Sequence, residues 1–131
     1  MTKIVTFCQR GNVRSVTTAI ILKDYAMYDD VLVAGVETTS ETTRAMLYRW
    51  ADIILICGDV SLLPYFDDVT NKIHLDIGVD EWQQPMNPSL VRIILHALKR
   101  DTSLIKTTRW DEPTYLMLND QAYLSRRGNH V

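Results

Sequence analysis

A cysteine and an arginine separated by five residues, Cys8 and Arg14, form the most chemically suggestive pattern in the sequence. A thiol that loses its proton easily is a strong nucleophile. A guanidinium can hold two oxygens of a phosphate group with its forked N–H groups. The pair therefore predicts a loop in which the sulfur of Cys8 attacks phosphorus while Arg14 holds the phosphoryl oxygens.

The residues on either side of this pair predict a turn from a strand to a helix. The apolar run before Cys8 indicates a buried strand over Lys3–Phe7, and a helix is expected over Val16–Met27 with Ser15 as its N-cap. Loop amides and a helix N-terminus carry partial positive charge, which favours a thiolate. Lowering the thiol pKa by about three units makes it nearly all thiolate at pH 7. The alternative is a buried structural cysteine with a solvated arginine nearby.

The composition is that of a globular protein. The 131 residues are enough for one domain with a hydrophobic core, and 47% are hydrophobic and 23% charged. The net charge of -2 does not indicate a nucleic-acid partner, and no apolar run approaches the ~20 residues of a membrane span. We expect a cytoplasmic protein, because the N-terminus lacks a signal-peptide pattern and two cysteines form no disulfide framework. The scattered His74, His96 and His130 predict no zinc site.

Apolar, strand-like runs alternate with helical stretches along most of the chain. Thr38 and Glu41 have the spacing of a capping box and open a predicted helix that ends at Trp50. Asn87 and Pro88 form a typical helix start. This alternation predicts a single α/β domain, with a doubly wound, four-stranded parallel sheet and helices on both faces. The predicted strands are 3–7, 31–34, 52–57 and 72–77, and residues 60–66 form a short helix or a loop.

The periodic pattern weakens from Asp101 onward. Residues 107–115 have the composition of an irregular segment, and residues 125–130 resemble a solvated end. We therefore expect a core over about residues 2–99 and a C-terminal appendage over 100–131, within one domain that spans 1–131.

Attack on a phosphate ester requires a proton for the leaving oxygen, and a positioned carboxylic acid accelerates this transfer by roughly 10²- to 10⁴-fold. Such a group should follow another strand, at the edge of the sheet that carries the Cys8 loop. Asp80, after the last predicted strand, meets this requirement. Asp111 and Asp59 are alternatives, and each could be an ordinary solvated carboxylate. Trp82 could form a wall of the cleft and stack on an aromatic substrate.

The segment Phe7–Ser15 resembles the nucleophile loop of the low-molecular-weight protein tyrosine phosphatases. The resemblance covers about residues 2–99 and points to a compact, predicted-phosphatase branch with a short acid loop. Further features that carry it are Ala34-Gly35, Trp50–Ile54, Leu75–Ile77, Asp80–Trp82 and Pro85–Leu90.

This resemblance implies a phosphatase that forms a cysteinyl-phosphate intermediate and acts on phosphotyrosine proteins or small aryl phosphates. It makes Cys8 the nucleophile, Arg14 the phosphate clamp and Asp80 the general acid. Ser15 is the hydroxyl donor to the thiolate, and Asn12 holds the loop in shape. We expect no metal or other cofactor, no nucleic-acid partner and no membrane. The expected substrate-binding residues are Gln9, Arg10, Gly11, Asn12, Val13, Ser15 and Trp82.

The sequence departs from the family pattern at several positions. The family has glycine two and asparagine three residues after the cysteine, where this chain has Arg10 and Gly11. Glu81 stands where a proline usually follows the acid, and Val13 stands where many relatives have a second cysteine. Arg10 adds positive charge beside the loop, and we expect its side chain to point outward.

Two other functions use the same residues. A phosphate- or phosphopeptide-binding module would keep the anion site without turnover, and the shifted glycine and asparagine are compatible with it. An arsenate reductase needs two further cysteines for a relay, whereas only Cys57 remains. Because Cys57 lies in a predicted buried strand, we expect a structural role for it. The sequence leaves the oligomeric state open.

Overall fold

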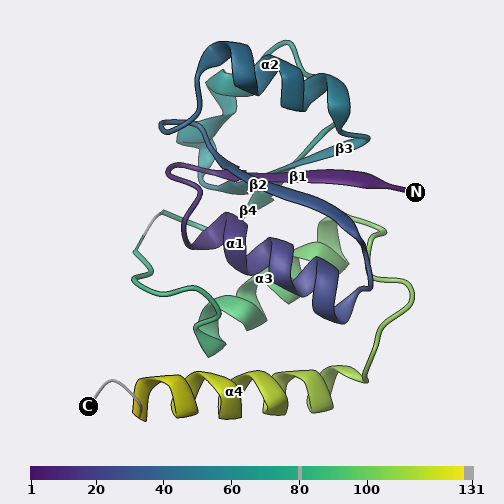
Figure 1. Cartoon of the computed structure of the whole chain (residues 1–131), viewed down its shortest axis with the longest axis vertical. Coiled ribbons are helices and arrows are strands. Elements are labelled where there is room, and N and C mark those ends of the chain that lie inside the picture. The colour runs from purple at the N-terminus through teal and green to yellow at the C-terminus, as the bar shows by residue number, and fades with distance from the viewer. Residues whose placement is uncertain (80, 129–131) are drawn as a thin grey trace.

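The computed structural model describes residues 1–79 and 81–128 and contains one parallel sheet of four strands. β1 (Lys3–Cys8) lies between β2 (Asp30–Gly35) and β3 (Ile53–Gly58), and β4 (Lys72–Asp76) forms the edge beyond β3. All three strand pairs are parallel, so the carboxyl ends of the strands share one edge of the sheet (Figure 1). The predicted α/β fold is confirmed.

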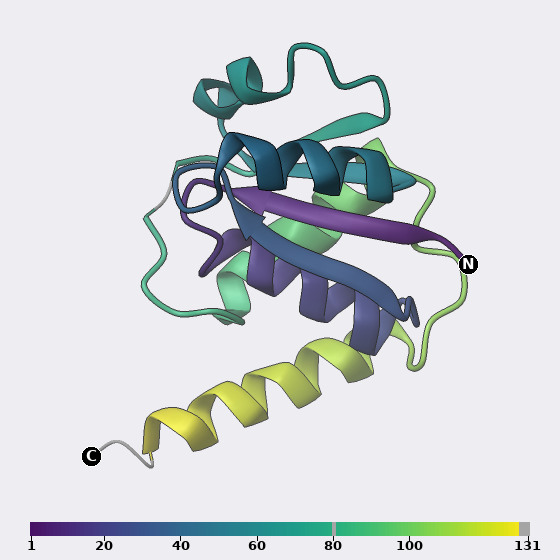
Figure 2. The same ribbon diagram turned by 45° about the horizontal axis from the view of Figure 1, so that its top comes forward.

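Helices cover both faces of this sheet (Figures 1 and 2). On one face lie α1 (Arg14–Ile20), which continues as the π-helix η1 (Ile21–Tyr25), and α3 (Pro88–Asp101). On the other face lie α2 (Glu41–Trp50) and the 3₁₀-helix η2 (Val60–Phe66). For residues 60–66 the sequence left a short helix and a loop open, and the structure has a short helix there.

Each face of the sheet has its own hydrophobic core. Side chains alternate along a strand, so Ile4 and Leu55 join the core under α1 and α3, whereas Val5 and Ile54 join the core under α2. β1 and β3 are buried on both faces, as central strands of a parallel sheet are. Cys8 belongs to the core under α1 and α3, which places its side chain on that face.

The first helix differs from its prediction at both ends. Its N-cap is Val13, which makes no side-chain cap, while Ser15 lies inside the first turn with its hydroxyl 3.0 Å from the sulfur of Cys8. The prediction that Ser15 is the N-cap is wrong, because this hydroxyl is engaged across the loop. The helical turns end at Tyr25, and Met27 lies beyond them with a positive φ of 67°.

The other two predicted helix starts have different outcomes. α2 is capped by Ser40, whose hydroxyl accepts the N–H of Thr43 at 3.2 Å, so the predicted capping box at Thr38 is wrong. The Thr38 hydroxyl instead donates to the Arg10 carbonyl at 3.2 Å. Asn87 caps α3 as predicted, because its side chain accepts a backbone N–H in the first turn.

The C-terminal residues fold onto the domain. Residues 102–111 are irregular. They lead to α4 (Glu112–Gly128), which packs against α3 on the side of α1 and α3 that faces away from the sheet (Figure 1). Tyr115 of α4 stacks between Tyr25 and Trp110, with ring centroids 4.6 and 5.9 Å away. α4 continues to Gly128, and Ser125 and Arg126 near its end are exposed, as expected for a solvated end. Residues 129–131 lie outside the described residues.

The buried ring of Tyr115 allows a test of how firmly α4 is held. No described group pairs with its buried hydroxyl. Tyr115→Ala is expected to lower the free energy of unfolding by about 3 kcal/mol, because it leaves an aromatic-sized cavity. Tyr115→Phe should leave it unchanged or raise it slightly, because an unpaired buried hydroxyl is removed. Denaturant unfolding measures both values, and equal losses in the two variants would contradict this packing role.

Candidate functional site

The structure brings Cys8 and Arg14 together at the carboxyl edge of the sheet. Cys8 is the last residue of β1 and Arg14 is the first of α1, so residues 9–13 form the turn between them. Both residues are almost fully buried, with exposed fractions of 2% and 1%. This is the strand-to-helix turn predicted from the sequence, at the edge where parallel sheets bind ligands.

Close backbone packing holds the loop in shape. The Cys8 carbonyl accepts the N–H of Val36 at 2.9 Å, which continues the contact between β1 and β2 into the loop. Gly11 has a positive φ of 72°, and a Cβ on it would lie 2.6 Å from the backbone nitrogen of Gly35. A larger residue does not fit, because the atoms it would meet are backbone. The exposed side chain of Asn12 makes no hydrogen bond with a described residue, so the backbone takes the role expected of Asn12.

The sulfur of Cys8 is surrounded by hydrogen-bond donors. The N–H of Gly11 donates to it at 3.2 Å, and the Ser15 hydroxyl lies 3.0 Å away. Burial raises the pKa of the Cys8 thiol, but the hydroxyl and backbone N–H of Ser15, the N–H of Gly11 and the charge of Arg14 outweigh it. The pKa of Cys8 is therefore below its ordinary value, which stabilises the thiolate.

Arg14 is a buried cation with one side of its guanidinium unsatisfied. Its Nη1 donates to the Gly78 carbonyl at 2.7 Å, whereas no described group pairs with its Nε. A Cβ on Gly58 would lie 2.6 Å from Nη1, so the guanidinium occupies the space that this glycine leaves. No described carboxylate forms an ion pair with Arg14. Because an isolated buried charge is costly, this arrangement favours an anion beside Nε.

Comparison of the chain with protein-family models, curated proteins and solved structures gave no match. Among residues 1–79 and 81–128, no three His, Cys, Asp or Glu side chains are grouped so that they could hold a metal ion. None of the described helices is long and apolar enough to cross a membrane. The chemistry of the site therefore rests on its own geometry.

Two side chains of the loop lie at its rim. Gln9 donates to a carboxylate oxygen of Glu37 at 2.8 Å. Arg10 lies 3.8 Å from the other oxygen of that carboxylate, with 65% of its side chain exposed, so the expectation that it points outward is confirmed. An exposed ion pair of this kind contributes little stability. Val13 is buried beneath the rim.

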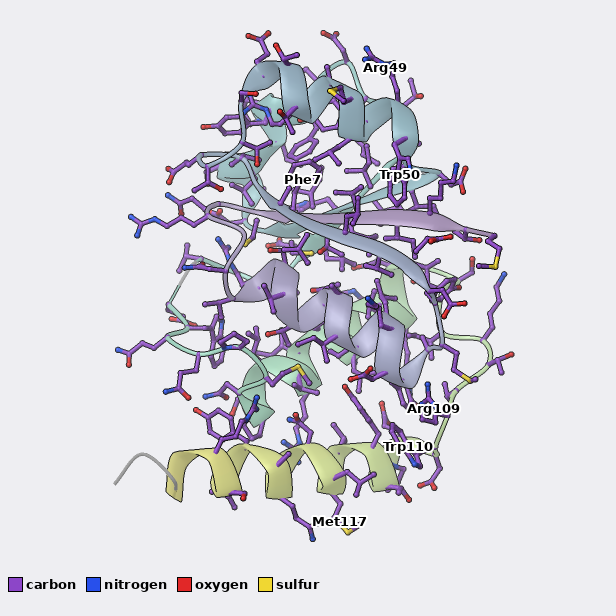
Figure 3. The ribbon with its side chains drawn as sticks, viewed as in Figure 1. Phe7, Arg49, Trp50, Arg109, Trp110 and Met117 are labelled. Atoms are coloured by element: carbon purple, nitrogen blue, oxygen red, sulfur yellow. The ribbon has the colours of Figure 1, made fainter. Side chains whose placement is uncertain are left out.

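The predictions of a general acid at Asp80, Asp111 and Asp59 have different outcomes. Asp80 lies outside the described residues. Asp111 accepts hydrogen bonds from the hydroxyl and N–H of Thr114, and these hold the pKa of Asp111 below its ordinary value. α4 begins just after the labelled Trp110, at the edge of the sheet opposite the Cys8 loop (Figures 1 and 3). Asp111 is therefore not placed to protonate a leaving group at Cys8.

Asp59 is a candidate for the general acid that lies within the described residues, at the carboxyl edge of the sheet where the Cys8 loop also lies. It directly follows Gly58, the residue that makes room for Arg14. Its carboxylate accepts the Ser61 hydroxyl at 2.7 Å, and the residue is half-buried. Asp59 therefore remains a structural alternative to Asp80.

Two further residues singled out in the sequence contact the hydrophobic core under α1 and α3. Trp82 contacts the core under α1 and α3, and no described group pairs with its buried Nε1. Cys57 is fully buried in β3, and burial raises the pKa of this thiol to about 12. Cys57 therefore has the structural position expected for it.

No site role was assigned from the sequence to three glycines that the structure places at the site. Gly58 makes room for the guanidinium, Gly35 lies against the loop backbone, and Gly78 presents its carbonyl to Arg14. The available signal was their position: Gly35 and Gly58 end β2 and β3, and Gly78 closely follows β4. A glycine at the carboxyl end of a strand indicates close backbone approach.

The contact between Ser15 and Cys8 predicts a change in titration. Ser15→Ala is expected to raise the pKa of Cys8, because the thiolate loses a hydrogen-bond donor. At a pH between the two values, the variant then carries less thiolate. The ultraviolet absorbance of the thiolate, taken as the difference from the corresponding Cys8→Ser protein, measures this shift. Ser103→Ala, at an exposed position, is the control, and identical titrations for both variants would refute the role of Ser15.

Proposed function

We propose that this protein is a cysteine-dependent phosphatase of the cytoplasm, which hydrolyses phosphotyrosine or other aryl phosphate monoesters without a metal ion. The observation that supports this most strongly is the buried guanidinium of Arg14, whose Nε has no described partner, beside a thiol of lowered pKa. A tetrahedral oxyanion supplies both the missing acceptor and the missing negative charge.

In the first proposed step, the thiolate of Cys8 attacks phosphorus. The S–P bond forms as the bond from phosphorus to the aryl oxygen breaks, and a carboxylic acid gives its proton to that oxygen. Arg14 holds the phosphoryl oxygens and stabilises the charge that develops on them. We propose Asp80 as the acid, because it follows Gly78 by two positions and the Gly78 carbonyl contacts Arg14.

In the second proposed step, water attacks the cysteinyl phosphate. The carboxylate formed in the first step takes a proton from this water, and the S–P bond breaks to release inorganic phosphate and the thiolate. The Ser15 hydroxyl, 3.0 Å from the sulfur, makes Cys8 a better leaving group for the same reason that it lowers the pKa of the thiol.

The low pKa of Cys8 favours catalysis over binding alone. A negative sulfur repels a bound phosphate, so a module that only binds phosphate gains nothing from a stabilised thiolate. The arsenate reductase alternative requires a reactive relay cysteine. Full burial and a pKa of about 12 make Cys57 unsuited to that task.

Hydrolysis of an aryl phosphate in the presence of a metal chelator tests the proposal. Cys8→Ser is expected to lower kcat at least about a thousandfold, because the nucleophile is lost. The same variant should retain binding of inorganic phosphate, because Arg14 and the loop amides remain. Arg14→Lys should weaken both phosphate binding and turnover, because lysine cannot form the forked contact.

Two results would overturn this assignment. Phosphate binding by the unmodified protein with no turnover of any aryl phosphate would favour the binding module. Full activity in Cys8→Ser would remove the cysteine from the reaction.

The general acid can be identified from the dependence on leaving group. Asp80→Asn is expected to slow hydrolysis of aryl phosphates with poor leaving groups by roughly 10²- to 10⁴-fold, and to affect good leaving groups little. Asp59→Asn is the matched variant at the same edge of the sheet, and Asp111→Asn is the control at the opposite edge. Steady-state rates over a series of aryl phosphates measure the effect. The same leaving-group-dependent loss in Asp59→Asn, with none in Asp80→Asn, would make Asp59 the acid.

A further inference from the structure

α2 is the least buried of the α-helices that flank the sheet. None of its ten residues is buried, whereas six residues of α3 are buried. A cavity of about 720 Å³ lies between α2 and the segment of residues 64–71, on the side of the sheet away from α1 and α3. The α2 residues that line it are Glu41, Arg44, Ala45, Tyr48 and Arg49.

Three of these residues lie along one side of α2 and are called the α2 stripe: Glu41, Ala45 and Arg49. They are spaced four residues apart, so they lie on one side of the helix. Glu41 and Arg49 are exposed, and neither forms an ion pair with another described residue. Figure 3 shows Arg49 projecting from α2 away from the sheet. The stripe thus carries two unpaired, opposite charges on either side of a small residue.

The order of these charges is self-complementary. When a second α2 helix lies antiparallel to the first, with both Ala45 residues at the two-fold axis, Glu41 of each copy faces Arg49 of the other. The two pairs are equivalent by symmetry, as in an isologous interface. The small side chain of Ala45 allows the helices to approach at the axis, and the cavity beside the stripe provides room for the incoming helix.

We propose that the α2 stripe is a homodimer interface, in which two copies of this chain pack their α2 helices antiparallel about Ala45. A second copy is the occupant that the charge pattern favours, because it supplies both complementary charges at once. The small net charge of -2 opposes such association only weakly.

Charge reversal on the full-length protein tests this interface. Glu41→Arg and Arg49→Glu, each alone, place like charges opposite one another at both pairs and should weaken dimerisation about a hundredfold. Sedimentation equilibrium over a range of protein concentrations measures the dissociation constant. Lys23→Glu, at an exposed position on η1, changes the net charge as Arg49→Glu does and should leave dimerisation unchanged. Circular dichroism confirms that each variant is folded.

Mixing the two single variants gives a sharper test. In a heterodimer of Glu41→Arg with Arg49→Glu, both pairs are again of opposite charge, so an equimolar mixture should recover the dimer that each variant alone has lost. A monomer at all concentrations for the unmodified protein would overturn the proposal. So would a dimer that survives both single reversals, or a mixture that remains monomeric when the unmodified protein does not.

Discussion

The site depends on how the fold accommodates the buried guanidinium of Arg14. A cation buried this deeply is costly unless it is hydrogen-bonded and neutralised. The Gly78 carbonyl satisfies one nitrogen, and no described carboxylate forms an ion pair with it. The thiolate of Cys8 is a negative charge whose formation the guanidinium favours. The hydrogen bonds from Ser15 and Gly11 lower the pKa of Cys8 more than the charge of Arg14 does, so the buried arginine is one of several groups that stabilise the thiolate.

This arrangement requires backbone segments to approach more closely than side chains allow. The parallel register of β1, β2 and β3 brings their carboxyl ends to one edge, and glycine ends both β2 and β3. Gly35 gives space to the Cys8 loop, and Gly58 gives space to Arg14. The sheet sets the position of the site. Because glycine has no side chain, Gly35 and Gly58 allow the parts of the site to pack closely.

The sequence predicted those features whose signal is local. Apolar β-branched runs identify strands such as β3, and their alternation with helices identifies the sheet. Ser15 was assigned as the N-cap from the helix pattern and as the partner of the thiolate from the resemblance, because a serine at a helix start serves equally well in either role. Only the position of the sulfur decides between the two. α4 was missed because the partner of Tyr115 is Tyr25, far away in the sequence. Contacts of that kind leave no periodic pattern near either residue.

The two halves of the site also differ in how closely they are packed. The Cys8 loop is clamped by backbone contacts with Val36 and Gly35. Gly78, by contrast, has no atom within 4 Å of the place where a Cβ would lie, and its carbonyl is held by Arg14. The sulfur side of the site is therefore closely packed, whereas the Gly78 side is more open. This asymmetry suits a reaction in which the nucleophile is preorganised before the substrate binds.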